Sequence, residues 1–237
     1  MKKYELTAEF IEQWGKKLFR IKALISFGSV EAGELGGYVE KEDNLAQDGD
    51  AWVCDGAKVY DNARVYGEAR VYGEARVYGE ARVCGNARVC GNAWVCGNAR
   101  VCGNAEVYGN AWVYDGAWVY GEAKVYGEAE VCGNARVCGN AEVCGNARVC
   151  GNADCLLIGR IGSRFSFTTF FKNKDKGITV SCGCFLGTIA EFRAKVTDTH
   201  GNNKHAKMYN LAADMAELQI LGEEHFDKLN TNKSEPF

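Results

Sequence analysis

The sequence predicts a mainly β protein built around a β-solenoid, in which short strands stack in successive coils. Alanine stands at every sixth position from Ala51 to Ala153, and valine stands two residues after each alanine from Val53 to Val149. Glycine followed by asparagine or glutamate completes most of these six-residue units. A unit this short cannot bury a hydrophobic face alone, so the units must stack on one another.

Each hexad is expected to form one side of a coil. In an extended segment alternate side chains face opposite ways, so alanine and valine point inward and the residue between them points outward. Glycine and asparagine then make the corner, because they tolerate positive φ. Three sides give a coil of eighteen residues, and successive coils pair as parallel strands about 4.8 Å apart. The array therefore forms about six coils.

The residue after each valine suggests an alternative geometry. Tyrosines from Tyr60 to Tyr78 precede cysteines from Cys84 to Cys102, and the same block returns from Tyr108 onward, which indicates a 48-residue duplication. Because 48 is a multiple of 24 and not of 18, a four-sided coil of 24 residues remains open. On a three-sided rod the duplication keeps the hexad register but shifts each block by two thirds of a turn.

The spacing of Val65 and Ala69, repeated through to Val149 and Ala153, resembles the hexapeptide repeat of left-handed β-helix proteins. In that family an aliphatic residue and a small residue four positions later point into the core. The resemblance implies a left-handed, three-sided coil over about half of the chain. The chain departs from the family where tyrosine or cysteine directly follows the valine, since the family usually has a small residue there.

The outward residues form three faces when they are sorted by a period of eighteen. One face carries Arg64, Arg82, Arg100, Trp118, Arg136 and Asp154 and is a basic stripe. Aromatic rings surrounded by guanidinium groups suit bases and phosphates. The predicted ligand site comprises Trp94, Trp112, Trp118, Arg76, Arg82, Arg100 and Arg136, with Trp94 and Trp112 stacked in adjacent coils.

The same residues allow other interpretations. Corner carboxylates such as Glu68, Glu74 and Glu80 could neutralise neighbouring arginines, and the tryptophans could form a stacking ladder or a subunit interface. We expect a scaffold or binding protein that forms homo-oligomers and whose partner is a host protein, a nucleotide or nucleic acid. The net charge of −3 indicates little about the partner.

An enzymatic role is the alternative function. The hexapeptide-repeat acyltransferases that the rod resembles use a histidine on or beside the coils as general base. The rod has none, since the three histidines are His200, His205 and His225. We therefore expect no catalytic residue and no cofactor, and an acyltransferase-like enzyme stays as the second hypothesis.

The N-terminal segment, residues 1–50, is predicted to cap the solenoid of residues 51–155. It contains a possible short helix over 7–13 and a strand-like run over 18–24. Val39 and Leu45 keep the six-residue phase and should open a first, irregular coil. A cap would cover strand edges that are otherwise an aggregation hazard.

The C-terminal segment, residues 156–237, is predicted to form a β-hairpin and two helices. Runs 164–171 and 178–184 are typical of strands joined by a polar turn. Thr188 with Glu191 is a capping box for a helix ending near Gly201, and a second helix should span about 204–221.

A two-cysteine, two-histidine zinc site at Cys182, Cys184, His200 and His205 is a minor candidate, because one residue between the cysteines is fewer than zinc sites usually have. A nucleophile pair of Cys184 and His200 is weaker still.

Nine of the twelve cysteines occupy the corner phase of the repeat, where tyrosine substitutes for them, and we expect all twelve to be free thiols. In the eighteen-residue coil, Cys84 and Cys102 or Cys132 and Cys150 would nevertheless lie within disulfide reach.

No apolar run has transmembrane length and the first ten residues lack an apolar signal region, so we expect a cytoplasmic protein without membrane contact.

The whole layout resembles hexapeptide-repeat proteins of phages and gut bacteria. The resemblance rests on the run from Arg20 to Leu24, the entry Leu35-Gly36-Gly37-Tyr38-Val39, the hexad array and the C-terminal cap. It implies a phage or prophage setting. Phage accessory proteins of this size often bind host defence components or signalling nucleotides, which by analogy makes sequestration of such a ligand a further hypothesis.

Overall fold

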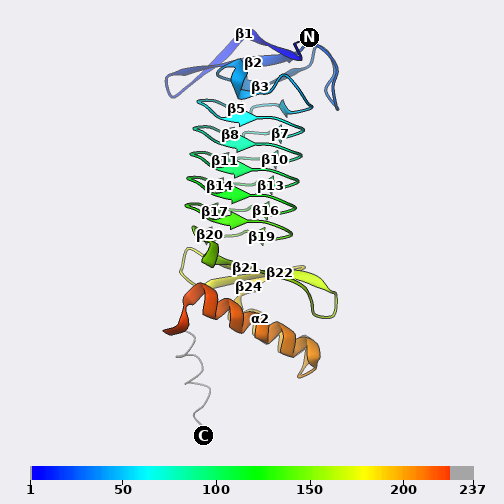
Figure 1. Cartoon of the computed structure of the whole chain (residues 1–237), viewed down its shortest axis with the longest axis vertical. Coiled ribbons are helices and arrows are strands. Elements are labelled where there is room, and N and C mark those ends of the chain that lie inside the picture. The colour runs from blue at the N-terminus through cyan, green and yellow to red at the C-terminus, as the bar shows by residue number, and fades with distance from the viewer. Residues whose placement is uncertain (1, 225–237) are drawn as a thin grey trace.

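The computed structural model describes residues 2–224 and shows a rod of stacked coils between an N-terminal and a C-terminal cap (Figure 1). Seventeen two-residue strands, three to a coil, give about six coils. The five-stranded sheet consists of β6 (Arg64–Val65), β9 (Arg82–Val83), β12 (Arg100–Val101), β15 (Trp118–Val119) and β18 (Arg136–Val137). The six-stranded sheet consists of β4 (Trp52–Val53), β7 (Arg70–Val71), β10 (Arg88–Val89), β13 (Glu106–Val107), β16 (Lys124–Val125) and β19 (Glu142–Val143).

The nine-stranded sheet extends from the rod into the N-terminal cap. Its rod strands are β5 (Lys58–Val59), β8 (Arg76–Val77), β11 (Trp94–Val95), β14 (Trp112–Val113), β17 (Glu130–Val131) and β20 (Arg148–Val149). They continue into β3 (Leu35–Val39), β2 (Lys16–Ala23) and β1 (Tyr4–Gln13). The cap is thereby hydrogen-bonded to the rod through one continuous sheet.

The period of the coil is eighteen residues. Val83 pairs in parallel with Val101, and Val101 pairs with Val119. The alanine and valine side chains of the central coils have no exposed surface, whereas the residues between them lie outside. The predicted β-solenoid and its inside-outside assignment are therefore confirmed, and the four-sided coil of 24 residues is wrong.

Glycine is required at the corners for two reasons. Gly103 has φ of 71°, and a Cβ atom there would lie 3.0 Å from the backbone nitrogen of Gly121 in the next coil. Asp61 and Asp115 adopt the same positive φ at two other corners, where each carboxylate accepts a hydrogen bond from the corner amide of the next coil. Close stacking of corner backbones thus favours glycine along the rod.

The N-terminal cap is an antiparallel hairpin of β1 and β2 packed on the first coil. The helix predicted over 7–13 is wrong, because pairing of this segment with β2 outweighs its local helix propensity. Trp14 and Gly15, both with positive φ, make the two-residue hairpin turn. The predicted strand over 18–24 is confirmed as β2. Val39 and Leu45 pair with valines twenty residues later and so form the irregular first coil.

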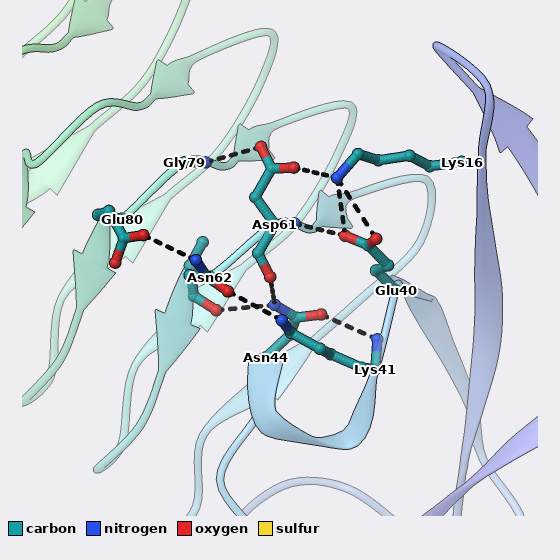
Figure 2. A network of polar contacts seen from close by, with 9 residues as sticks. Lys16, Glu40, Lys41, Asn44, Asp61, Asn62, Gly79 and Glu80 are labelled. Carbon is teal, nitrogen blue, oxygen red and sulfur yellow. Dashed lines mark hydrogen bonds and ion pairs between the residues drawn. The ribbon is translucent and has the colours of Figure 1, made fainter.

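A polar network holds this cap to the corner of the first two coils (Figure 2). The Asp61 carboxylate pairs with the Lys16 ammonium group and accepts a hydrogen bond of 3.0 Å from the amide of Gly79. The side chain of Asn44, in the short 3-10 turn η1 (Glu42–Asn44), donates to the carbonyl oxygen of Asp61 at 3.1 Å. Glu40 accepts from both Lys16 and the amide of Asp61. These contacts therefore fix the orientation of the cap about the long axis of the rod.

The C-terminal cap is a four-stranded antiparallel sheet covered by two helices. After the 3-10 turn η2 (Asn152–Asp154) come β21 (Cys155–Ile161), β22 (Ser166–Lys172), β23 (Ile178–Cys182) and β24 (Phe185–Thr188), followed by α1 (Ile189–His200) and α2 (Lys204–Leu221). The predicted hairpin is its central pair, and the capping box of Thr188 and Glu191 is present. A separate hydrophobic core joins this sheet to the helices.

The expectation of twelve free thiols is wrong at one pair. Cys132 and Cys150 occupy equivalent corners of adjacent coils, with their Cα atoms 4.4 Å apart, and form a disulfide. The parallel register causes this proximity, as it does for Cys84 and Cys102, which remain free. Within residues 2–224, no helix has both the length and the apolar composition to cross a lipid bilayer.

Candidate functional site

The outward residues of the five-stranded sheet form a column of like charge. Register pairs Arg64 with Arg82, Arg82 with Arg100, Arg100 with Trp118 and Trp118 with Arg136. We call these five residues the arginine ladder. Its four arginines are exposed, and parallel pairing spaces adjacent rungs by about 4.8 Å. Arg64 lay on the predicted basic face but outside the predicted site, and it completes the column.

No carboxylate neutralises the arginine ladder in the part of the chain that the structure describes. None of its four guanidinium groups lies within 4.0 Å of an acidic side chain. Glu74 instead pairs with Lys58 at 2.9 Å, and Glu80 accepts a hydrogen bond of 2.7 Å from Asn62. The interpretation that these two corner carboxylates neutralise arginines is therefore wrong.

The other two rod faces are built differently. On the six-stranded sheet Arg88 lies 3.9 Å from Glu106, its neighbour in the next coil. On the nine-stranded sheet Arg148 lies 3.8 Å from Glu130, again in the adjacent coil. Each of these faces therefore carries a carboxylate beside a cation, whereas the arginine ladder contains only cations and one tryptophan.

Trp118 is held between two rungs of the ladder. The guanidinium carbon of Arg100, from the preceding coil, lies 4.6 Å from the centre of the indole ring, and that of Arg136, from the following coil, lies 5.0 Å from it. Each contact contributes about 0.5–1 kcal/mol at an exposed site. Because the ring already interacts with both guanidinium groups, Trp118 orients the arginines rather than offering an open surface for a base.

The remaining predicted residues lie on the nine-stranded sheet. Trp94 and Trp112 stack as predicted, with ring centres 4.8 Å apart and planes inclined by 4°. Trp112 is 44% exposed. Among the described residues no ring contact joins this stack to Trp118. The predicted site is therefore divided between two faces of the rod.

Arg76 belongs to the N-terminal cap contact and not to the arginine ladder. Its guanidinium carbon lies 4.9 Å from the ring centre of Trp94 and 5.5 Å from that of Trp14, at the tip of the β1–β2 hairpin. Trp14 also packs edge-on against Tyr60 and Tyr78, both at 5.9 Å. Sequence reasoning missed Trp14, because it lies outside the hexads and no local pattern shows where the hairpin tip folds.

A hollow of about 440 Å³ adjoins the N-terminal end of the ladder. Arg64 and Arg82 form one wall, Tyr66 contributes an aromatic ring, and Gln47 and Asp43 of the cap form the opposite side. A hydrogen bond with Cys84, together with partial burial, raises the pKa of the Tyr66 phenol, so the hydroxyl is neutral at physiological pH. The hollow thus combines the guanidinium groups of Arg64 and Arg82 and the neutral Tyr66 phenol with the carboxylates of Glu42 and Asp43 on the side of the cap.

The four residues of the candidate zinc site do not converge. The Sγ atom of Cys182 accepts a hydrogen bond from Thr168 at 3.2 Å, while Cys184 is exposed beyond the end of β23. His200 stacks on Tyr209, and its ring centre lies 5.8 Å from that of His205. Across residues 2–224, no group of three potential metal ligands is found. His225 lies outside the described residues.

Comparison with known proteins agrees with the coil geometry. A family model for the YdcK beta-solenoid repeat matches residues 57–73, 81–97 and 99–115. The chain is similar to the YdcK beta-solenoid repeat. Each matched segment spans almost one eighteen-residue coil, and together the segments include all three rungs of the ladder up to Arg100. No curated protein matches the chain.

Proposed function

We propose that this chain is a non-enzymatic β-solenoid protein that binds an anionic, phosphate-bearing ligand along the arginine ladder. The observation that supports this most is the column of four exposed guanidinium groups without an acidic partner among the described residues. Two unit charges about 5 Å apart in water repel each other by about 0.8 kcal/mol. A bound anion would turn that cost into attraction.

The geometry favours recognition of phosphates over recognition of bases. Guanidinium groups bind phosphate oxygens through paired hydrogen bonds. Trp118 already interacts with Arg100 and Arg136, which leaves it little surface for stacking on a base. The hollow beside Arg64 and Arg82 is also lined by the carboxylates of Glu42 and Asp43, so a phosphate would bind on its arginine side, and the rungs that follow would contact further phosphates. Both a nucleotide and a single-stranded nucleic acid fit this arrangement.

Binding should be measured by fluorescence anisotropy with a labelled oligonucleotide and, in competition, with linear and cyclic nucleotides. The double variant Arg82→Gln, Arg100→Gln should lose most of the affinity. Arg88→Gln is the matched control, because Arg88 has the same hexad position but lies beside Glu106 on another face. If wild-type protein binds none of these ligands at millimolar concentration, the proposal is wrong.

Self-assembly through the Trp94–Trp112 stack is the second candidate function. A half-exposed tryptophan on a flat sheet face suits a subunit contact. In that case Trp112→Ala should change the oligomeric state without affecting oligonucleotide binding.

An acyltransferase-like activity is the other alternative. It would need a general base, and the rod has no histidine that could act as one. A phage-encoded origin, which the sequence resemblance implies, and a cytoplasmic location, which the lack of an apolar segment leads us to expect, would give the ladder access to host nucleotides.

A further inference from the structure

Helix α2 has two apolar faces, and the described residues cover one of them. Ala206, Ala213, Ala216 and Ile220 are buried against the C-terminal sheet and α1. On the other side four large apolar side chains are exposed: Met208 (40%), Leu211 (63%), Met215 (57%) and Leu218 (45%). We call these four residues the α2 stripe. A helix that is apolar on both sides is typical of a helix buried on both sides.

The position of α2 leaves the stripe accessible at the end of the molecule. The C-terminal sheet lies between the rod and α2, and the helix runs across the end of the rod (Figure 1). The buried face of α2 packs toward that sheet, so the α2 stripe faces away from the solenoid. Another molecule could approach there without contacting the coils.

The spacing of the α2 stripe indicates what kind of surface covers it. Its members follow one another at intervals of three, four and three residues, which is the a and d pattern of a coiled-coil seam. Such a seam packs against a second helix with the same pattern. From this geometry we propose that a second copy of the chain covers the stripe, with the two α2 helices antiparallel around a two-fold axis.

The stripe is complementary to itself in this arrangement. When two α2 helices run antiparallel and are centred between Leu211 and Met215, Met208 lies opposite Leu218 of the second copy, and Leu211 lies opposite Met215. The same four residues then meet on both sides without an offset, as an isologous contact requires. The result is a dimer of two rods joined at their C-terminal ends.

Charge opposes this contact only modestly. Asp214, which borders the stripe near its centre, is paired with Arg193 of the same chain at 2.7 Å, and the same guanidinium group binds Glu217 at 2.7 Å. One guanidinium group balances only one of these two carboxylates, so each copy brings a net charge of −1 from this cluster, and water at the rim screens the repulsion between the copies. On the two flanks of the stripe, Lys207 is exposed and can remain hydrated, and the Gln219 amide donates to the carbonyl oxygens of Ala153 and Cys155 of its own chain.

The area sets the expected strength of the dimer. Four half-exposed Leu and Met side chains present on the order of 400 Å² of apolar surface, which is large for an uncovered patch on a monomer. A standard interface uses about 800 Å² per partner, so the α2 stripe with its rim gives a contact at the small end of that range. We expect dissociation in the micromolar range and hence a dimer that depends on protein concentration.

The test is analytical ultracentrifugation of the full chain between 1 and 200 micromolar, a range chosen on the order of the expected dissociation constant. Wild-type protein should be dimeric at the upper end. Leu211→Glu should weaken dimerisation at least about 100-fold, because each dimer would bury two carboxylates. Leu186→Glu is the control, since Leu186 is exposed in the same domain but lies on β24 outside the stripe, and it should leave the dimer intact.

A charge pair tests the antiparallel register. Met208→Lys alone should weaken the dimer, and Met208→Lys with Leu218→Glu should restore it, because each lysine then faces a glutamate of the other copy. Both positions are near half exposed, so circular dichroism and the melting temperature should show folded protein throughout. A wild-type monomer at every concentration, a dimer that survives Leu211→Glu, or a double variant that stays monomeric would overturn the inference.

Discussion

Removing one rung of the arginine ladder should change the salt dependence of oligonucleotide binding by an amount that the structure predicts. Each phosphate that a single strand shares with a cationic side chain contributes about 0.7 to the slope of log affinity against log salt. Four ladder arginines therefore give a slope of about −3, and Arg82→Gln should reduce it to about −2. Between 50 and 200 mM salt, the wild-type affinity should fall about 50-fold and the variant affinity about 20-fold.

The assay is anisotropy with one labelled single strand at four salt concentrations, compared among wild-type protein, Arg82→Gln and Arg88→Gln. Arg88 is also exposed, but it lies near Glu106 on the six-stranded sheet, so its removal should leave the slope unchanged. Equal slopes for wild type and Arg82→Gln, or equal losses for the two variants, would refute the reasoning. The first result would show that Arg82 contacts no phosphate, and the second that binding is spread over the whole surface.

Three further predictions concern stability. Val101→Ala removes two methyl groups from a fully buried side chain and should lower the free energy of unfolding by about 2 kcal/mol, whereas Arg100→Ser, which removes only the contact with the Trp118 ring, should lower it by about 0.5–1 kcal/mol in the same urea titration. Gly103→Ala should lower the melting temperature more than Gly145→Ala, because only the first places a Cβ atom against the next coil; equal shifts would contradict this. Burial raises the pKa of the Cys155 thiol to about 12, so the folded state keeps a proton that the unfolded state loses from about pH 9. Stability should therefore fall as the pH rises from 9 toward 12, and Cys155→Ser should reduce that slope in thermal melts.

The periodic part of the molecule could be predicted from the sequence because one rule determines many contacts. Once Ala and Val point inward and the coil has three sides, residues eighteen apart must pair, and the Trp94–Trp112 stack follows directly. The number of sides was harder to predict, because the 48-residue duplication is compatible with a different coil. Backbone pairing between coils, which composition does not reveal, decides between the two geometries.

The parts that could not be predicted depend on contacts between segments distant in the sequence. The segment that forms β1 has helix-forming residues, and only β2 makes it a strand. Trp14 reaches Arg76 because the polar network around Asp61 fixes the hairpin on the rod. Because Arg76 contacts the hairpin tip, it does not lie with the other arginines of the predicted site. Arg64, in contrast, was identifiable from the period of eighteen alone.

The eighteen-residue register also limits how the gene for such a protein can change. Recombination between near-identical hexads alters the length of the chain in steps of six residues, yet only steps of eighteen return each downstream side chain to its original face. The 48-residue duplication is not such a step, so the duplicate of Arg64, which is Trp112, lies on a different sheet. The arginine ladder therefore draws its first three rungs from one copy of the duplicated block and its last two from the other. A straight column of charge on this rod therefore depends on a spacing of eighteen residues between successive ladder residues. The gain or loss of a single hexad between two of them would move the later residues to another face.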